Sequence, residues 1–399
     1  MNQNKKICVI GLGYIGLPTA ALLANRGYSV HGVDVIQSTV DTINRGEIHI
    51  VEPELDTFVS SAVKRGKLNA SLKPDIADVF IIAVPTPFHK GYVPNVDYVV
   101  SATKAIAPYL QDSNIVILES TSPVGTTELV EETLKESSVD TSKLYIAHCP
   151  ERVLPGQIMR ELVENDRIVG GTTPEATQRT VEFYKTFVSG EVLSTDARTA
   201  EMAKLTENSF RDTNIAFANE LSMLCDKFDI NVWELIKLTN RHPRVNVLQP
   251  GAGVGGHCIA VDPWFIVHAG GETAKMIRTA REVNNYKTEW AIEKIKNAAL
   301  TFEAQNGRKA KVACMGLAFK PDIDDLRESP ALYITKRLKA DGLDILAVEP
   351  NIESHDELEI INYKKALEKA DIVTFLVAHK EFKTLEIKTN LDFCGVLNK

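Results

Sequence analysis

Short apolar runs alternate with longer amphipathic stretches over the first 130 residues of the chain. Alternation of this kind is typical of a parallel, doubly wound sheet with helices on both faces. The runs that predict strands are residues 6–10, 29–33, 79–84 and 114–119, with further strands expected at 144–148 and near 167–169. The expected fold class of this region is therefore α/β.

The pattern changes near Asp196, a suitable N-cap for one helical stretch that runs without Gly or Pro to about residue 228. After Gly307 the alternation returns, with strands expected at 311–317, 344–348 and 371–377 and a helix at 329–339. These changes predict three domains: a Rossmann-type domain over 1–195, a central helical domain over 196–305, and a second Rossmann-like domain over 306–399.

The two outer domains repeat one order of features: strand, glycine, helix, strand, acidic residue. The order runs from Gly11 to Asp34 in the first domain and from Gly316 to Glu349 in the last. An insertion at residues 319–328 accounts for the greater length of the second copy. Two nucleotide-binding domains joined by a helical segment are therefore the architecture we expect.

Composition narrows the classes of function. The 399 residues include 45 Lys and Arg against 53 Asp and Glu, so the chain lacks the basic excess that binding to nucleic acid requires. The cysteines are scattered, without the close pairs of a disulfide framework or a zinc site, and no apolar run reaches the ~18 residues of a membrane span. We expect a cytoplasmic protein with no metal, no nucleic-acid partner and no membrane partner.

A glycine-rich turn, GLGYIG at residues 11–16, follows the first expected strand. It opens a helix, and Asp34 comes 23 residues after Gly11, which together make the motif more specific than a bare GxGxxG. The glycines permit a tight turn, close approach of a pyrophosphate and helix packing. Asp34 would bind ribose hydroxyls and repel a 2′-phosphate, which favours NAD over NADP. The alternative is a Rossmann half that binds no cofactor.

Two further strand ends carry turn-forming residues, at 85–87 (PTP) and 120–123 (STSP). Ligands bind at the carboxyl ends of strands in such sheets, so Thr86 and Thr121 are candidate contacts, although either could simply cap a helix. The cofactor candidates in this part of the chain are Gly11, Gly13, Tyr14, Ile15, Gly16, Asp34, Thr86 and Thr121.

Four glycines precede a single cysteine in the segment PGAGVGGHC at residues 250–258. Most lone cysteines are buried and inert. Here Asp262 and Pro263 look like an N-cap and a first helical residue, which would place the Cys258 thiol just before a helix and favour its thiolate. The local sequence leaves both roles open, nucleophile or structural cysteine, and Asp262 could be no more than the cap.

Lys204 and Asn208 stand four residues apart on the expected long helix and project from one face. A lysine and an amide together can stabilise an oxyanion, although a solvated helix face is the commoner role of such residues. With a nicotinamide and a thiol, they would form a set that oxidises an alcohol or aldehyde to an acid through a thioester.

Seven ordered segments resemble the UDP-glucose/GDP-mannose dehydrogenase family over essentially the whole chain. They are residues 11–16, 84–87 (VPTP), 119–121 (EST), 150–152 (PER), 203–208 (AKLTEN), 255–258 (GGHC) with Asp262, and 316–320 (GLAFK) followed by 327–330 (RESP). The resemblance implies a four-electron oxidation of a UDP-sugar at C6 with NAD. Cys258 would add to the C6 aldehyde, and Lys204 and Asn208 would hold the oxyanion. Lys204 and Asp262 would assist proton removal through a water.

Residues 148–156 (HCPERVLPG) and 240–246 (NRHPRVN) are similar to the branch that oxidises UDP-N-acetylmannosamine to its uronic acid. UDP-N-acetylglucosamine or UDP-glucose is the alternative substrate. A two-electron hydroxyacid-type dehydrogenase or a non-catalytic NAD-binding protein is a more distant alternative. In the UDP-glucose branch a glutamate usually assigned as general base falls on Pro155 of this chain. Its role must therefore pass to Glu151, Asp262 or an ordered water.

The resemblance also implies the remaining site residues. The catalytic set is Cys258, Lys204, Asn208, Asp262, Glu151 and Thr121, with Arg327 near the cofactor. The substrate contacts are Glu151, Arg152, Val153, Lys204, Asn208, Arg211, His242, Arg244, Gly255 and Lys320. The family forms at least dimers through its central helices, so we expect a homodimer or higher oligomer in which Arg244 reaches a neighbouring sugar site. The UDP-binding domain is expected to be short at its end, which would weaken UDP binding.

Overall fold

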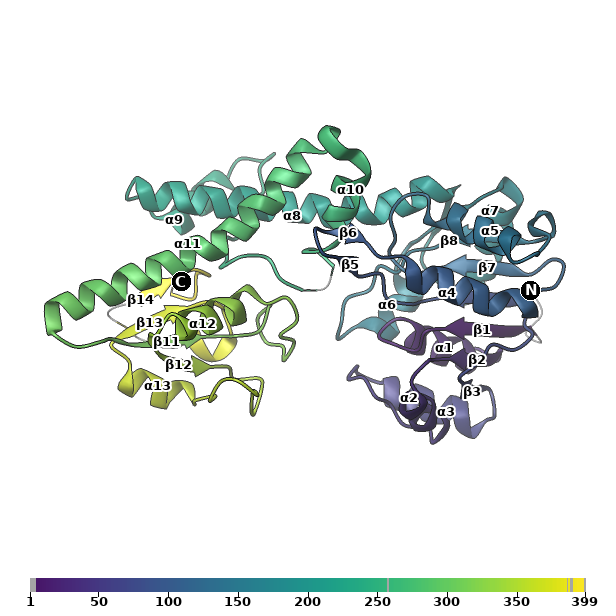
Figure 1. Cartoon of the computed structure of the whole chain (residues 1–399), viewed down its shortest axis with the longest axis horizontal. Coiled ribbons are helices and arrows are strands. Elements are labelled where there is room, and N and C mark those ends of the chain that lie inside the picture. The colour runs from purple at the N-terminus through teal and green to yellow at the C-terminus, as the bar shows by residue number, and fades with distance from the viewer. Residues whose placement is uncertain (1–4, 257, 386, 388–389, 398–399) are drawn as a thin grey trace. The chain divides into compact units, whose positions relative to one another are not determined.

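The computed structural model describes residues 5–256, 258–385, 387 and 390–397. Its chain divides into two compact units, Met1–Thr206 and Glu207–Lys399 (Figure 1). The division into three domains at 195/196 and 305/306 stays a prediction. His257, from the glycine-rich segment, lies outside the described residues. Within the described part of the chain, no helix is long and apolar enough to cross a membrane.

An eight-stranded sheet forms the centre of the first unit, in the order β10-β9-β8-β7-β4-β1-β2-β3. Its strands are β1 (Lys6–Ile10), β2 (Ser29–Val33), β3 (Leu68–Ser71), β4 (Val79–Ile82), β7 (Ile115–Leu118), β8 (Tyr145–His148), β9 (Arg167–Gly171) and β10 (Val192–Asp196). Every neighbouring pair is parallel except β8 and β9. The doubly wound α/β sheet is confirmed, with one correction: its last two strands run opposite to the rest, a common feature at the edge of a parallel sheet.

Helices cover both faces of this sheet, as its apolar strands require. They are α1 (Gly16–Asn25), α2 (Gln37–Asn44), α3 (Leu55–Lys64), α4 (Asp97–Ile106), α5 (Thr126–Glu136), α6 (Ile158–Glu164) and α7 (Pro174–Tyr184), and a small hairpin joins β5 (Phe88–His89) to β6 (Val93–Pro94). Alternate residues of β1 serve the two faces. Ile7 packs in one core cluster with Leu17 of α1, and Cys8 packs in the other with Val99 of α4.

One 31-residue helix, α8 (Ala197–Lys227), runs from the first unit into the second. Asp196 caps it as predicted, because its carboxylate accepts the Thr199 amide at 2.9 Å and the Thr199 hydroxyl at 2.7 Å. One turn later, the buried Glu201 accepts the amides of Gly125 and Thr127 at 2.6 and 2.7 Å and so caps α5. The first turns of α8 are thereby fastened to the first unit.

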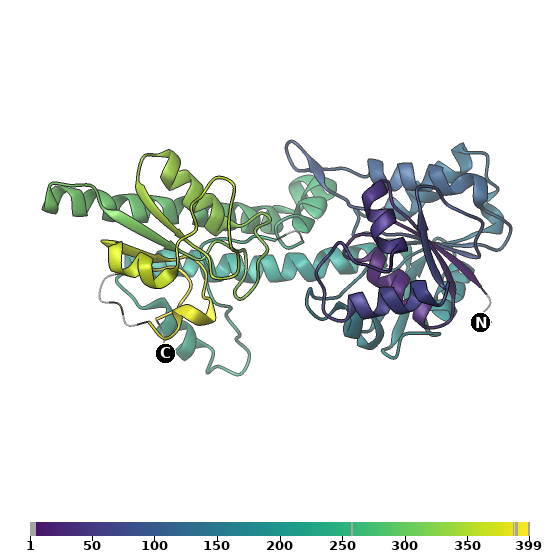
Figure 2. The same ribbon diagram turned by 90° about the horizontal axis from the view of Figure 1, so that it is seen from below.

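The second unit contains a four-stranded parallel sheet in the order β12-β11-β13-β14. Its elements are β11 (Lys311–Met315), β12 (Asp344–Val348), β13 (Ile372–Phe375), β14 (Asn390–Asp392), α9 (Val232–Thr239), α10 (Asp262–Gly270), α11 (Lys275–Asn306), α12 (Pro330–Ala340) and α13 (Tyr363–Lys369). Figure 1 and Figure 2 both show this sheet beside α11 and α12, and Ile295 and Ile334 of these helices share a core with Val312 of β11. The 32-residue α11 was not among the expected elements.

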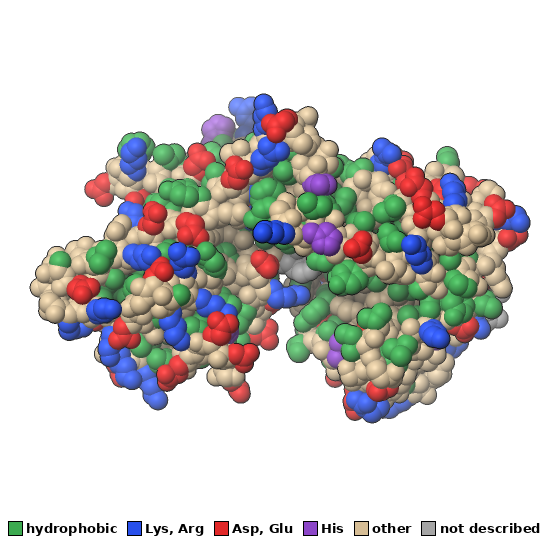
Figure 3. All heavy atoms as spheres, viewed as in Figure 1, with side chains coloured by type: hydrophobic (Ala, Val, Ile, Leu, Met, Phe, Trp, Pro, Cys, Tyr) green, Lys and Arg blue, Asp and Glu red, His purple; other side chains and the backbone are tan. Residues whose placement is uncertain are grey.

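Charge is spread evenly over the visible surface of each unit. On the face seen in Figure 3, acidic and basic side chains of the described residues are interspersed and form no broad patch of one sign.

A buried ion pair joins two long helices inside the second unit, where Arg281 Nη1 of α11 lies 2.6 Å from Asp212 Oδ1 of α8. The two helices are therefore held together by polar as well as apolar contacts.

Candidate active site

The turn after β1 gives each of its three glycines a separate role. Gly11 has a φ of 91°, and a Cβ there would lie 2.5 Å from the carbonyl oxygen of Ala83. A Cβ on Gly16 would collide with the Gly11 carbonyl, whereas one on Gly13 would meet nothing within 4 Å. Other backbone atoms leave no room for a side chain at Gly11 and Gly16, whereas the space beside Gly13 is empty. A pyrophosphate could approach the backbone at Gly13 in this arrangement.

Asp34, at the end of β2, is held in place by two backbone amides. Its carboxylate accepts the Leu12 amide at 3.1 Å and the Ile36 amide at 3.0 Å. Carboxylate oxygens have further lone pairs, so this half-buried group can also accept ribose hydroxyls. Tyr14 and Ile15 lead into α1, and no side chain caps that helix at Ile15. The residues of this turn therefore fit NAD.

Two neighbouring strand ends lie in direct contact beside this turn. The Thr86 hydroxyl donates to the Thr121 carbonyl at 2.5 Å, and the Ser120 hydroxyl donates to the Val84 carbonyl at 2.7 Å. Neither threonine is the N-cap of a helix, because α4 and α5 begin further along the chain. The capping alternative is therefore wrong, and the contacts of Thr86 and Thr121 with the cofactor stay predictions.

Glu151 follows β8 and forms a buried ion pair with Arg167 of β9. Arg167 Nη1 lies 2.6 Å from Glu151 Oε2, and these side chains are 1% and 5% exposed. The other oxygen of Glu151 accepts the Arg152 amide at 2.7 Å. Both carboxylate oxygens of Glu151 are therefore engaged within the protein. The role of Glu151 as the base that Pro155 cannot supply stays a prediction.

The next two residues hold the loop after β8 in place. The Arg152 guanidinium donates to the carbonyl of Asp166 at 3.0 Å, and the Arg152 carbonyl accepts the Asn165 amide side chain at 3.1 Å. Val153 packs, partly buried, against the core of the first unit. These contacts explain the shape of the loop, and the contacts of Arg152 and Val153 with a substrate stay predictions.

A second buried carboxylate, Glu119, lies close enough to this ion pair for the charges of Glu151 and Arg167 to affect its pKa. It is the first residue of the segment 119–121, but we assigned it no role from the sequence. Tyr184 donates its hydroxyl to Glu119 at 2.7 Å, and the Arg167 guanidinium lies 5.7 Å from the centre of the Tyr184 ring. Burial, followed by the charge of Glu151, raises the pKa of Glu119 to about 7. The sequence feature that could have indicated a contact between Glu119 and Glu151 is their position, because each follows one of two adjacent buried strands.

The helices α8 and α10 meet at a short hydrogen bond between two predicted site residues. Asn208 Nδ2 donates to Asp262 Oδ2 at 2.5 Å, and both side chains are buried. Helix α10 begins at Asp262, and its N-cap is Val261, whose side chain makes no capping hydrogen bond. The expectation that Asp262 is the N-cap is therefore wrong. The Asp262 amide already donates to the Cys258 carbonyl at 2.8 Å, so Asp262 is the first residue of the helix, and its carboxylate accepts the Asn208 side-chain amide.

Cys258 forms the start of that turn. Its carbonyl accepts the amides of Val261 and Asp262 at 3.0 and 2.8 Å. Its side chain is exposed, whereas the other five cysteines are buried or half-buried. The alternative of a buried structural cysteine is therefore wrong. The exposed thiol therefore lies just before the first turn of α10.

Lys204 lies one turn before Asn208 on α8, half-buried and on the same face. Arg211, three residues after Asn208, is exposed. Lys204 belongs to the first unit, whereas Asn208, Asp262 and Cys258 belong to the second. Inside the second unit the structure brings together Asn208, Asp262 and the loop of Cys258.

The glycine loop ahead of Cys258 packs against the segment that follows β11. A Cβ on Gly255 would lie 2.5 Å from the Glu328 carbonyl oxygen, and one on Gly256 would lie 2.9 Å from the Phe319 ring. The Gly256 amide donates to the Arg327 carbonyl at 3.3 Å. The expected contact of Gly255 with the substrate stays a prediction, and the structure shows that Gly255 and Gly256 pack closely against another part of the chain.

The remaining predicted contacts lie on loops of the second unit. Lys320 is exposed on the insertion after β11, and Arg327 Nη2 lies 2.6 Å from Asp325 Oδ2. His242 and Arg244 are exposed in the loop after α9, where the His242 ring accepts the Arg244 amide at 3.3 Å. The contacts of Lys320, His242 and Arg244 with substrate, and of Arg327 with NAD, stay predictions.

Comparisons with known proteins agree with these features. The models of the UDP-glucose/GDP-mannose dehydrogenase family match its NAD binding domain at residues 5–188, its central domain at 198–286 and its UDP binding domain at 313–396. The chain is 57% identical to a UDP-N-acetyl-D-mannosamine dehydrogenase of Campylobacter jejuni, over 99% of this chain and 100% of that protein. It is 54% identical to an NDP-N-acetyl-D-galactosaminuronic acid dehydrogenase of Ralstonia solanacearum, over 96% and 92% of the two chains.

Among solved structures, the UDP-N-acetyl-mannosamine dehydrogenase Cap5O of S. aureus is 41% identical. It superposes with a TM-score of 0.89 over 99% of this chain and 96% of that one. Sequence and fold agree over the full length, and the open glycine turn and the exposed cysteine lie inside the matched regions. The chain belongs to the UDP-glucose/GDP-mannose dehydrogenase family, with the NAD-binding and UDP-binding domains of that family.

Proposed function

We propose that this chain oxidises UDP-N-acetyl-D-mannosamine at C6 to UDP-N-acetyl-D-mannosaminuronic acid, a four-electron reaction in two NAD-dependent steps. The observation that carries the proposal is the exposed Cys258 before α10, next to the buried Asn208–Asp262 pair. It lies in a chain with NAD-binding and UDP-binding domains, and its 57% identity to a dehydrogenase of this substrate supports the choice of sugar.

The turn after β1 would hold the cofactor through backbone amides near Gly13, and Asp34 would bind its ribose. When bound, NAD accepts the hydride that leaves C6 in each step. The carboxylate of Asp34 would lie close to a 2′-phosphate and repel it, so NAD is preferred over NADP. Thr86 and Thr121 would line the same edge of the sheet.

The first step removes a proton from the C6 hydroxyl. We assign it to a water held by Asp262, with the Lys204 ammonium stabilising the developing negative charge on oxygen. Asp262 fits this role because its carboxylate is buried and oriented by Asn208. Glu151 is committed to Arg167 and would help to shape the loop that meets the sugar.

The second step begins when the Cys258 thiolate adds to the C6 aldehyde and forms a thiohemiacetal. Asn208 carries two N–H groups, of which one points to Asp262, so the other can donate to the new oxyanion together with Lys204. Loss of the second hydride leaves a thioester on Cys258. Water then attacks the thioester carbonyl, which releases the carboxylic acid and returns the thiol.

A panel of UDP-sugars tests the substrate. UDP-N-acetylmannosamine should yield two NADH per sugar, with higher kcat/KM than UDP-N-acetylglucosamine, UDP-N-acetylgalactosamine and UDP-glucose. The galactosamine epimer belongs in the panel because the Ralstonia relative is 54% identical. Turnover confined to another epimer would contradict the choice of sugar, and one NADH per sugar would contradict the four-electron reaction.

We propose further that the chain forms a homodimer through α8. Phe210, Phe217 and Leu224 recur every seven residues along this helix and are 69%, 60% and 43% exposed, and Phe228 follows at 62%. Apolar residues at this spacing form one stripe that a second copy of the helix can cover. Light scattering should give the mass of a dimer, and Phe217→Ser should lower that mass to a monomer's. A monomeric wild-type protein would contradict the proposal.

A cytoplasmic location follows from the proposed chemistry. The reaction needs Cys258 as a free thiol, and the six cysteines form no disulfide in the structure. A reducing compartment keeps an exposed thiol in that state. Activity recovered only from an oxidising compartment would contradict this location.

A further inference from the structure

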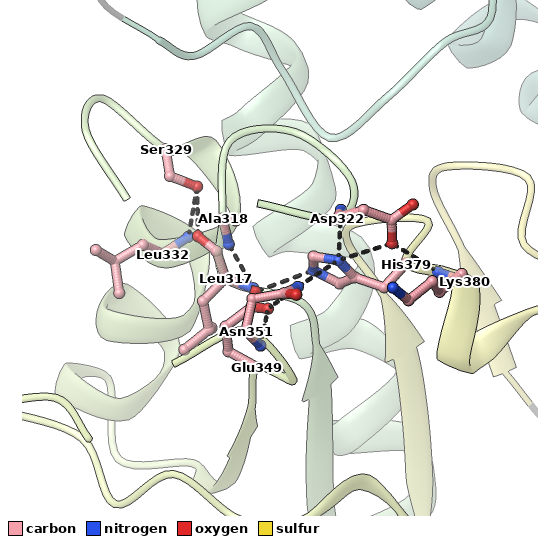
Figure 4. A network of polar contacts seen from close by, with 9 residues as sticks. All are labelled: Leu317, Ala318, Asp322, Ser329, Leu332, Glu349, Asn351, His379 and Lys380. Atoms are coloured by element: carbon pink, nitrogen blue, oxygen red, sulfur yellow. Dashed lines mark hydrogen bonds and ion pairs between the residues drawn. The ribbon is translucent and has the colours of Figure 1, made fainter. Parts of the chain in front are cut away.

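A fully buried histidine, His379, organises a polar network in the second unit (Figure 4). Its Nε2 lies 3.0 Å from Oε2 of the buried Glu349, and its Nδ1 accepts the Asp322 amide at 2.9 Å. Since Nδ1 accepts a backbone N–H, the ring proton of the neutral histidine belongs on Nε2 and is donated to Glu349. Asn351 Nδ2 also lies 3.1 Å from Nδ1. The imidazole therefore connects two segments far apart in the sequence.

The carboxylate of Glu349 holds the start of the segment that follows β11. Its Oε2 accepts the amides of Leu317 and Ala318 at 2.7 and 2.9 Å, and its Oε1 accepts the Asn351 amide at 3.1 Å. The end of the same segment is held through Asp322, whose amide donates to the His379 ring. Three backbone amides of residues 317–322 thus donate hydrogen bonds to two buried side chains, Glu349 and His379.

The segment fixed in this way reaches the loop of the reactive cysteine. It carries the exposed Lys320 and also Phe319, whose ring would lie 2.9 Å from a Cβ on Gly256. Gly256 precedes Cys258 by two residues. A shift in the backbone of residues 317–322 would therefore be transmitted through Phe319 to the glycine loop and would also move Lys320.

We propose that His379 and Glu349 are positioning residues for the sugar-nucleotide site: they fix residues 317–322 and so set Lys320 and the glycine loop in place for the substrate. The inference rests on the proposed function, because it assigns this face of the second unit to the UDP-sugar. The two side chains act through the backbone and do not touch the substrate. Removing them should weaken sugar-nucleotide binding and leave the NAD site in the first unit intact.

A metal site is the competing explanation of this cluster. Ligand atoms of Asp322, His379 and Glu381 lie within 4.8 Å of one another. The ring nitrogen on the side of the Asp322 carboxylate is Nδ1, 3.8 Å from Asp322 Oδ1, and its lone pair already accepts the Asp322 amide. The network is therefore explained by hydrogen bonds, and we assign no metal to it.

The test replaces the histidine and follows the two substrates separately. His379→Leu keeps the volume of the side chain and removes both hydrogen bonds. We expect the KM for UDP-N-acetylmannosamine and the Kd for UDP, measured by calorimetry, to rise at least tenfold, while the KM for NAD changes less than twofold. His379→Gln, which can still donate to Glu349, should recover most of the affinity. Asn351→Ala, a milder change in the same network, should raise the KM about threefold.

Leu338→Ala is the matched control, since Leu338 is buried in the core of the same unit and belongs to none of these hydrogen bonds. It should lower the melting temperature and leave both KM values unchanged. The positioning role is overturned if His379→Leu and Asn351→Ala leave UDP binding unchanged. It is also overturned if they raise both KM values equally. If the histidine variant does not fold, Asn351→Ala decides. A wild-type protein that binds no UDP would instead overturn the proposed function, and the positioning role with it.

Discussion

The glycine turns at Gly11 and Gly316 have the same backbone geometry, but their surroundings differ. Gly11 and Gly316 have φ values of 91° and 95°. Each donates its amide at 2.8 Å to the last residue of the next strand, Val33 in the first unit and Val348 in the second. Each turn is also closed by an acidic residue one position further on. The sequence repeat therefore corresponds to a structural repeat.

The difference lies in what the acidic residue and the following helix do. Asp34 is half-buried and takes one amide of its turn, whereas the buried Glu349 takes two. In the first unit α1 begins at Gly16, so its N-terminus points into the turn, but in the second α12 begins only at Pro330. A Rossmann-type turn thus becomes a dinucleotide site only when its amides are left open and a helix follows at once.

The largest effect should appear at a residue that belongs to neither turn. Cys258→Ser should lower kcat by at least ~10³-fold, because a hydroxyl without a strong base is a much poorer nucleophile than a thiolate. The affinities for NAD and UDP should stay within twofold, which single-turnover kinetics and calorimetry can measure. If the serine variant still delivered two NADH per sugar at the wild-type rate, thioester catalysis would be disproved.

The same substitution at the two acidic residues should separate the two turns. Asp34→Ala should lower the ratio of kcat/KM for NAD over NADP by about tenfold or more, because the carboxylate no longer favours ribose hydroxyls over a phosphate. Glu349→Ala should leave that ratio unchanged and lower the melting temperature, because the buried amides of Leu317 and Ala318 lose their hydrogen-bond acceptor. Equal changes in cofactor preference would show that the turns are not specialised.

Alanine at the two equivalent glycines should sharpen the comparison through stability. Gly11→Ala and Gly316→Ala both force a left-handed conformation, which costs about 1–2 kcal/mol. The new Cβ would meet the Ala83 carbonyl in the first case and the Val377 side chain in the second. The nearest Val377 atom is its Cβ, at the same 2.5 Å as the Ala83 oxygen, and rotation about χ1 does not move a Cβ. Both clashes therefore require the backbone to shift, and the two variants should be destabilised to a similar degree in urea unfolding. A Gly316→Ala variant as stable as the wild type would contradict this explanation.

The smallest effect should be a difference in pH dependence between two buried carboxylates. The pKa of Glu119 is raised to about 7 by burial and then by the charge of Glu151. Burial alone would also raise the pKa of Glu349, but hydrogen bonds from His379 and from backbone amides lower it overall. The two residues should therefore respond to pH in opposite directions.

A raised pKa means that the folded state binds the proton more tightly than the unfolded state. The stability that Glu119 contributes is thus present below its ordinary pKa of 4.5 and is lost as pH rises through about 7. Glu349, with a lowered pKa, contributes stability above its ordinary pKa that is lost on acidification. Melting temperatures from pH 4 to 8 should show that Glu119→Gln removes the loss on the neutral side. An unchanged profile would contradict the assignment.

The sequence predicted the regular parts of this molecule well, because buried parallel strands and glycine turns have strong local patterns. The bounds expected for β1, β2 and β12 agree with the structure, and Asp196 caps α8 as predicted. The reversed direction of β9 was beyond such patterns, since strand direction depends on tertiary pairing. So was the length of α11, whose buried face includes Arg281, Asn284 and Lys287 rather than only apolar residues.

Within the candidate site, local reasoning found the residues but not all of their partners. Asp262 looked like a helix cap because Pro263 follows it, yet its carboxylate binds Asn208, 54 residues earlier. Glu151 was one of three candidates for the base, and the sequence did not show that it forms a buried ion pair with Arg167 of the next strand. His379 had no local signal at all. Each of these contacts joins distant segments, and a single sequence does not reveal which distant segments meet.

The distribution of cysteines gives the chain a built-in chemical handle. Burial raises the pKa of Cys8, Cys149 and Cys314 to about 12, and Cys258 is the only one of the six with an exposed side chain. Alkylating dyes and peroxides react with accessible thiolates. A maleimide fluorophore should therefore label the folded wild-type protein at Cys258 alone. Peroxide should inactivate the enzyme by oxidising the Cys258 thiol to a sulfenic acid, and the fold should remain intact.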